Sequence, residues 1–343
     1  MLRTSRLLDR RRLFVGVGMI GAAAAAVVTS AATVLVGEAR LARRKVEART
    51  PINDPPTGNG IWGSGTGEPI VLAIMGDSSA VGLGVDDVTE TPGVLIAAGL
   101  SNLSGRPVRL VRVAISGSES KDLDAQITDA LPHNPDVAVI MIGTNDVTAR
   151  TRVEVAVSQL GDAVRRLRAA DVGVVVGTCP DLGTVRPIPQ PLRSIARRWS
   201  RQLAAAQVVA VVEAGGRTVS LGSALGPVFA QNFEMWSDDG FHPSGAGYAA
   251  AASLVLPSVA DVLGYWPISR EHILTRMKNR ARSIESTAQR ASAQTGAEVI
   301  GEGRARLDGT TSMWGTVRRL LPIPLPAPLR HNEHHPDQDK LGA

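Results

Sequence analysis

The sequence has very little cysteine and few aromatic residues. Cys179 is the only cysteine among 343 residues, so no disulfide forms within one chain and no cysteine cluster holds zinc. Phe, Trp and Tyr make up only 3% of the chain, which leaves few rings on which nucleic-acid bases would stack. We therefore expect neither a disulfide-stapled fold nor a nucleic-acid-binding protein. Cys179 itself, at the end of an apolar run, is expected to be a small buried residue.

An excess of positive charge is also absent from the middle of the chain. The formal net charge is +5, but residues 70–265 carry 15 Lys and Arg against 19 Asp and Glu. Residues 1–50, by contrast, carry 10 basic residues against 3 acidic ones. Basic segments that flank an apolar stretch are typical of proteins at a membrane surface.

Charge is missing altogether from residues 13–37. This run is rich in Ala, Val and Gly and is long enough to cross a hydrocarbon core of roughly 30 Å. The basic residues 1–12 before it include Arg10, Arg11 and Arg12, an arrangement typical of a twin-arginine export signal. We expect residues 13–37 to bind a membrane, as a cleaved signal or a retained anchor, and the protein to be exported and either membrane-anchored or secreted.

The rest of the chain divides into three further parts by composition. Residues 38–69 become rich in Pro, Gly, Asn and Thr toward their end, which predicts a linker. Residues 70–265 are predicted to form the folded domain. Residues 266–343 are a basic tail, expected to be helical over 269–306 and extended over the proline-rich 321–328, with His331, His334 and His335 solvated.

Within residues 70–265, short apolar runs alternate with longer amphipathic stretches. The runs predict strands buried on both faces, at 70–75, 108–113, 137–142 and 172–177. The stretches predict helices at 92–103, 120–131, 152–169, 191–212 and 244–263. Strands that alternate with helices predict an α/β fold with a parallel sheet covered by helices on both faces.

Polar residues and glycines follow several of the predicted strands. Asp77 and Ser78 come directly after the first strand, Gly117 follows the second, and Asn145 follows the third. The carboxyl ends of parallel strands meet at one edge of the sheet, where ligands bind in such folds, so we expect these residues to lie close together. A serine there could act as a nucleophile, and an amide side chain could stabilise an oxyanion.

A histidine lies just ahead of the last predicted helix, in the sequence Asp238-Asp239-Gly240-Phe241-His242. An aspartate three residues before a histidine in a tight turn can accept a hydrogen bond from one imidazole nitrogen, which leaves the other free to take a proton from serine. The spacing favours Asp239 over Asp238 for this role. The order Ser78, Gly117, Asn145 and then Asp239 with His242 predicts a serine hydrolase.

These residues resemble the motifs of the SGNH hydrolases, also called the GDSL esterase and lipase family. The name-giving residues would be Ser78, Gly117, Asn145 and His242, and the resemblance covers roughly residues 70–264. One departure is Ser79, where the family name expects leucine. The resemblance implies a flavodoxin-like three-layer α/β/α sandwich with a central parallel sheet, a catalytic triad completed by Asp239, and an oxyanion hole formed by Ser78, Gly117 and Asn145.

The expected activity is hydrolysis of carboxylic esters through an acyl-enzyme, with no metal or organic cofactor. The substrate would be a small-molecule or lipid ester, and we interpret Asp77 as a structural residue of the nucleophile loop. Two related alternatives are a carbohydrate O-deacetylase and an acyltransferase of the cell envelope. Others are a catalytically silent membrane-anchored binding protein and an envelope tether that acts through the basic tail. No sequence feature indicates an oligomeric state.

Overall fold

The computed structural model describes residues 36–42, 44–50, 54–265, 297–300 and 304–307. The apolar segment 13–37 falls almost entirely outside the described residues, as do the proline-rich stretch 321–328 and the three histidines of the tail. Helical residues 36–42 and 44–47 precede the main body of the fold.

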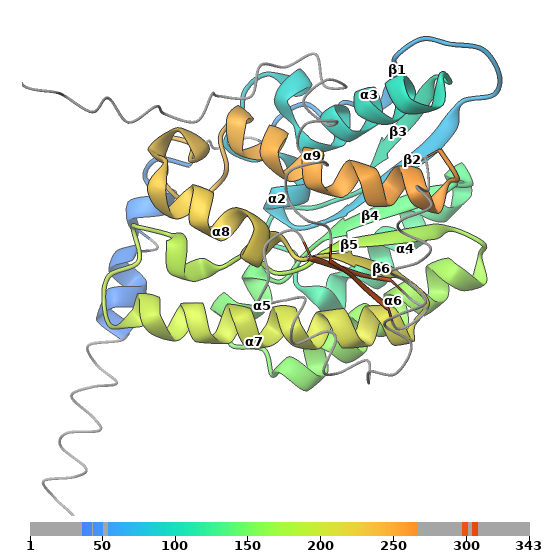
Figure 1. Ribbon diagram of the computed structural model, residues 1–343. Helices are drawn as coiled ribbons and strands as arrows, with labels where there is room; N and C mark the ends of the chain where they lie inside the picture. The colour runs from blue at the N-terminus through green and yellow to red at the C-terminus, as the bar shows by residue number, and fades with distance from the viewer. Residues whose placement is uncertain (1–35, 43, 51–53, 266–296, 301–303, 308–343) are drawn as a thin grey trace, which may run out of the picture.

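The body is a mixed α/β fold around one mostly parallel sheet (Figure 1). The strand order is β1-β3-β2-β4-β5-β6-β7-β8. Its parallel part consists of β2 (Ile70–Gly76), β3 (Val108–Arg112), β4 (Val137–Met141), β5 (Gly173–Gly177) and β6 (Arg217–Val219). The first four of these are the strands that the apolar runs predict. The three-residue β6 was not predicted, because Arg217–Val219 is too short to give a periodic signal.

Antiparallel strands extend the sheet at both of its edges. Strand β1 (Gly60–Trp62) pairs with β3 within the segment predicted as a linker. At the other edge, β7 (Ala297–Ile300) pairs with β6, and β8 (Arg304–Leu307) pairs with β7. The prediction of a helix through residues 269–306 is therefore wrong where it overlaps these strands, because hydrogen bonding to an open sheet edge overrides a weak helical pattern.

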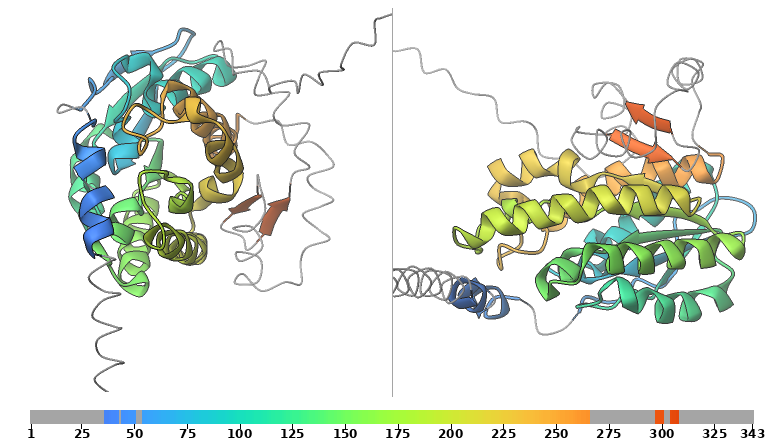
Figure 2. Two further views of the ribbon diagram at one scale, coloured as in Figure 1. Left: turned by 90° about the vertical axis from the view of Figure 1, so that its left-hand side faces the viewer. Right: turned by 90° about the horizontal axis from the view of Figure 1, so that it is seen from below.

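Helices cover both faces of the sheet, which gives three layers (Figures 1 and 2). One face packs against α3 (Pro92–Ser104), α8 (Leu221–Gln231) and α9 (Gly245–Val262). The opposite face packs against α4 (Leu123–Ala130), α6 (Val153–Ala169) and α7 (Leu192–Glu213). Alternate residues of β2 take part in the two cores: Leu72 and Ile74 belong to the first, Ala73 and Met75 to the second. This alternation explains why a strand buried on both faces reads as a continuous apolar run.

The strand order places a crevice at one point of the sheet. After β2 the chain crosses to β3 on one side, and after β3 it returns to β4 on the other side of β2. Such a reversal opens a gap at the carboxyl end of the strand between the two crossovers, which here is β2. Two short helices begin at this edge, α2 (Ser78–Val81) after β2 and α5 (Thr144–Ala149) just after β4.

Candidate active site

The end of β2 places Ser78 at this crevice. Gly76 has a φ of 129°, and a side chain there would collide with the carbonyl oxygen of Met141 on β4, so only glycine fits. Asp77 then caps α2, since its Oδ1 accepts hydrogen bonds from the backbone N–H of Ser79 at 2.9 Å and from the Ser79 hydroxyl at 2.7 Å. The short turn thus presents Ser78 at the start of α2, and Ser79 takes a structural role in shaping it.

The loop ahead of α9 brings His242 to the same point. His242 Nε2 lies 3.0 Å from Ser78 Oγ, and His242 Nδ1 lies 2.6 Å from Asp239 Oδ2. The structure therefore places the three residues in one hydrogen-bonded chain, with 164 positions between Ser78 and His242. Among the described contacts, the His242 ring meets Asp239, the aspartate that the spacing favours, and not Asp238.

Asp239 is held ionised by a dense set of donors. Its Oδ1 accepts from the Ser237 hydroxyl at 2.8 Å and from the backbone N–H groups of Phe241 and His242 at 2.7 and 2.9 Å. Burial by itself raises the pKa of the Asp239 carboxyl, but the hydrogen bonds from the His242 ring and backbone outweigh it and lower that pKa far below its ordinary value. A permanent carboxylate at this position keeps the proton on Nδ1 and leaves Nε2 to face Ser78.

The loop after β3 and the start of α5 lie beside Ser78. The backbone N–H of Ile115 donates to the Gly76 carbonyl at 3.2 Å, and the Asn145 side-chain amide donates to the Ser118 carbonyl at 3.0 Å. Gly117, between these two contacts, has a φ of 85° and an exposed backbone. Among the described residues, the backbone N–H groups of Ser78 and Gly117 have no acceptor. The second hydrogen of the Asn145 amide is likewise available to a substrate oxygen.

A buried glutamine fixes this arrangement, and the sequence analysis missed it. Gln126 of α4 is 1% exposed, and its side-chain oxygen accepts from the Gly76 backbone N–H at 2.7 Å. Its amide donates to the Gly76 carbonyl at 3.0 Å and to the Ser118 hydroxyl at 3.1 Å. The residue therefore ties the end of β2 to the loop that carries Gly117. A lone glutamine on an amphipathic helix gives no sequence signal for such a role.

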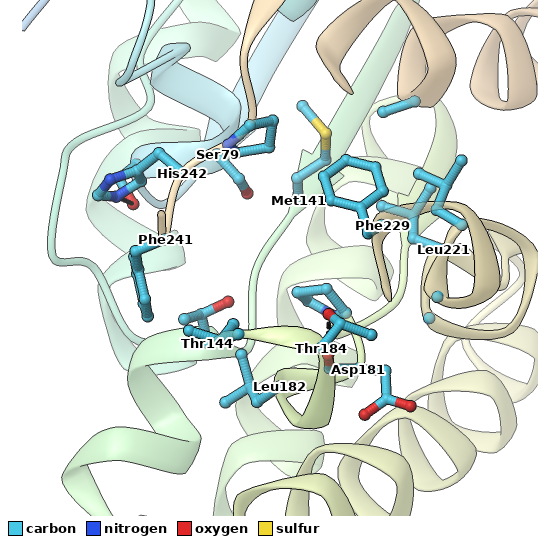
Figure 3. Close-up of a pocket in the computed structure, with 18 of the residues that line it drawn as sticks. Ser79, Met141, Thr144, Asp181, Leu182, Thr184, Leu221, Phe229, Phe241 and His242 are labelled. Atoms are coloured by element: carbon cyan, nitrogen blue, oxygen red, sulfur yellow. Dashed lines mark hydrogen bonds between the residues drawn. The ribbon is translucent and has the colours of Figure 1, made fainter. Parts of the chain in front are cut away.

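A small apolar pocket opens next to Ser78 and His242 (Figure 3). Its volume is about 100 Å³, and it lies between the ends of β4 and β5 and the helices α8 and α9. The apolar side chains that line it include Met141, Leu182, Leu221, Leu225 and Phe229. The segment after β5 contributes Pro180, Asp181 and Leu182 to the lining. Cys179 beside it is 1% exposed, and burial raises the pKa of its thiol well above the ordinary value, so it is not a nucleophile here.

Comparison with known proteins identifies the family of the chain. A family model described as "GDSL-like Lipase/Acylhydrolase family" matches residues 74–250, a range that includes Ser78, Gly117, Asn145, Asp239 and His242. The chain belongs to this family. It is 42% identical over 247 residues to the GDSL-like esterase Rv1075c of Mycobacterium tuberculosis, a match that covers 68% of this chain and 78% of that protein. The chain is accordingly a carboxylic ester hydrolase.

Matches among solved structures were also found. Axe2, an acetylxylan esterase from Geobacillus stearothermophilus, is 20% identical with a TM-score of 0.45, and the match covers 60% of this chain and 99% of Axe2. LAE5, a hydrolase from the metagenome of Lake Arreo in Spain, gives the same identity, TM-score and coverage. TesA is 23% identical with a TM-score of 0.41, over 57% of this chain and 98% of TesA.

Proposed function

We propose that the chain hydrolyses carboxylic esters with Ser78 as nucleophile, His242 as general base and acid, and Asp239 as the residue that orients and charges the histidine. The observation that carries this proposal is the continuous hydrogen-bonded chain from Ser78 Oγ through both ring nitrogens of His242 to Asp239, at 3.0 and 2.6 Å. Nucleophile, base and orienting carboxylate in this order are the arrangement that activates a serine.

The first half of the reaction acylates Ser78. Nε2 of His242 takes the hydroxyl proton while Oγ attacks the ester carbonyl carbon, and the electron pair of the carbonyl bond moves onto its oxygen. The N–H groups of Ser78, Gly117 and the Asn145 side chain would stabilise this oxyanion. When the carbonyl re-forms, the bond to the alcohol oxygen breaks, and the alcohol leaves with the proton held by His242.

The second half returns the enzyme to its starting state. A water molecule gives a proton to Nε2 of His242 and attacks the acyl carbon, and the same donors stabilise the second oxyanion. Collapse of this intermediate breaks the bond to Ser78, whose oxygen takes the proton back. The carboxylic acid is then released.

The pocket beside Ser78 supports a preference for short acyl groups. Its lining is apolar, as a hydrocarbon chain requires, and a volume of about 100 Å³ suits a few carbon atoms better than a long fatty acyl chain. The physiological substrate would then be a short-chain ester, and O-acetyl groups of the cell envelope fall within that class.

The test is hydrolysis of p-nitrophenyl esters from acetate to palmitate by the full chain in detergent, compared with the Ser78→Ala variant. We expect wild type to hydrolyse acetate and butyrate with the highest kcat/KM, and Ser78→Ala to lose at least about 10³-fold in kcat. Full activity of a correctly folded Ser78→Ala protein would disprove the mechanism. A preference for palmitate would leave the mechanism intact but reject the assignment of the pocket.

A further inference from the structure

The segment ahead of the sheet contacts the triad carboxylate directly. Residues 44–47 are helical, and the turn that follows them ends at Thr50. The hydroxyl of Thr50 donates to Asp239 Oδ2 at 3.0 Å across 189 positions of sequence. This is the same oxygen that accepts from Nδ1 of His242.

Thr50 lies in a different part of the chain from the other donors to Asp239. The remaining hydrogen bonds come from Ser237, Phe241 and His242, all in the loop that carries Asp239 itself. Thr50 is thus the one donor to this carboxylate, among the described residues, that lies outside the loop. It comes from a segment that the sequence analysis assigned to a linker.

One further hydrogen bond joins this segment to the body of the fold. Glu38 Oε2 accepts from the backbone N–H of Leu192, at the first residue of α7, where a carboxylate is stabilised by the helix terminus. A cavity of about 770 Å³ lies between the segment and the histidine loop, and Arg186 and Pro187 also line it. Figures 1 and 2 show the segment (blue) against the body of the fold, near the start of α7.

The contact has a chemical consequence at the carboxylate. The Thr50 hydroxyl lies 2.9 Å from the Val46 carbonyl as well, but an ionised carboxylate is the stronger acceptor for its single proton. A second donor on Oδ2 fixes the carboxylate plane in which the His242 ring must lie. It also withdraws part of the negative charge that would otherwise stabilise the protonated imidazole.

We propose that Thr50 is a positioning residue, through which the N-terminal segment completes the Ser78–His242–Asp239 arrangement. This inference rests on the proposed function.

The test compares Thr50→Val, Thr50→Ser and Thr57→Val in the full chain in detergent. Valine keeps the shape of threonine without the hydroxyl, serine keeps the hydroxyl, and Thr57 is an exposed threonine a few residues away that does not contact Asp239. We expect Thr50→Val to lower kcat about tenfold with KM unchanged, an effect of the size expected for one hydrogen bond to a charged group. Thr50→Ser and Thr57→Val should stay within about twofold of wild type.

A pH profile separates positioning from a general loss of structure. In Thr50→Val the carboxylate keeps more of its charge for the imidazole, so the acidic limb of kcat/KM against pH should move to higher pH. The charged groups that face the site are the same in all variants: Asp77, Asp238, Arg44, Lys45, Arg49 and Arg186.

Each outcome supports or rejects the inference. Wild-type kcat and an unchanged pH profile in Thr50→Val would overturn it, and so would failure of Thr50→Ser to restore activity, since packing alone would then explain the loss. Full activity in Ser78→Ala, measured alongside, would instead reject the proposed function itself.

Discussion

At the scale of single residues, Asn145 makes the most specific contribution expected of the oxyanion site. One hydrogen of its amide is used by the Ser118 carbonyl, and the other is left for the substrate. We expect Asn145→Ala to lower kcat by ~10²- to 10³-fold with little change in KM, because the donor acts on charge that develops only in the transition state. Steady-state kinetics with p-nitrophenyl butyrate checks this. A loss below threefold in a folded protein would exclude Asn145 from the oxyanion site.

Asp77 is a residue whose charge opposes folding. It is buried, its Oδ2 has no partner among the described residues, and burial raises the pKa of its carboxyl despite hydrogen bonds from Ser79. An acid with a raised pKa in the folded state costs no stability below its ordinary value of 3.8, and the cost grows as pH rises above that value.

Replacement of Asp77 by asparagine should therefore raise the Tm at pH 7 and leave it unchanged near pH 3.5. Thermal unfolding followed by circular dichroism at the two pH values measures the difference. Asp86→Asn, at an exposed position, is the control and should change the Tm at neither pH. A lower Tm for Asp77→Asn at pH 7 would show that the buried charge has a stabilising partner.

At the scale of elements, the site depends on how α4 is joined to β2 through Gln126. Loss of its side-chain amide would leave the Gly76 N–H unpaired in the interior, at about 1–3 kcal/mol, whereas the Gly76 carbonyl would keep the hydrogen bond from the Ile115 N–H. Gln126→Leu should therefore lower the free energy of unfolding by roughly 1–3 kcal/mol in urea titrations.

Gln159→Leu serves as the matched control for this substitution. The side-chain oxygen of Gln159 is also buried, but it has no hydrogen-bond partner among the described residues. Its replacement should cost less than about 0.5 kcal/mol. Equal losses in the two variants would mean that the hydrogen bonds of Gln126 add nothing to stability.

At the scale of the whole molecule, the sequence predicted the central sheet well because its strands are buried on both faces. The continuous apolar runs located β2 to β5, and the polar residues after them located Ser78, Gly117 and Asn145. Helix α8 was missed because Pro227 lies inside it and Gly222 and Gly226 weaken its pattern. Strand β1 was missed because Gly60–Trp62 is short and sits in a glycine-rich stretch.

Sequence patterns do not identify the residues that support the site. Gln126 and Thr50 act through contacts with residues 50 and 189 positions away, and neither belongs to a motif. Their partners are determined only by the packing of complete elements. Sequence reasoning therefore found the groups proposed for the chemistry and missed the groups that hold them in place.

Ser78, and not its neighbour Ser79, is the proposed nucleophile. The most direct measurement is labelling of the full chain with a fluorophosphonate, followed by mass spectrometry of the peptide that contains both serines. We expect a single label on Ser78 that disappears in Ser78→Ala and His242→Ala and persists in Ser79→Ala. A label on Ser79, or one that survives in Ser78→Ala, would contradict it.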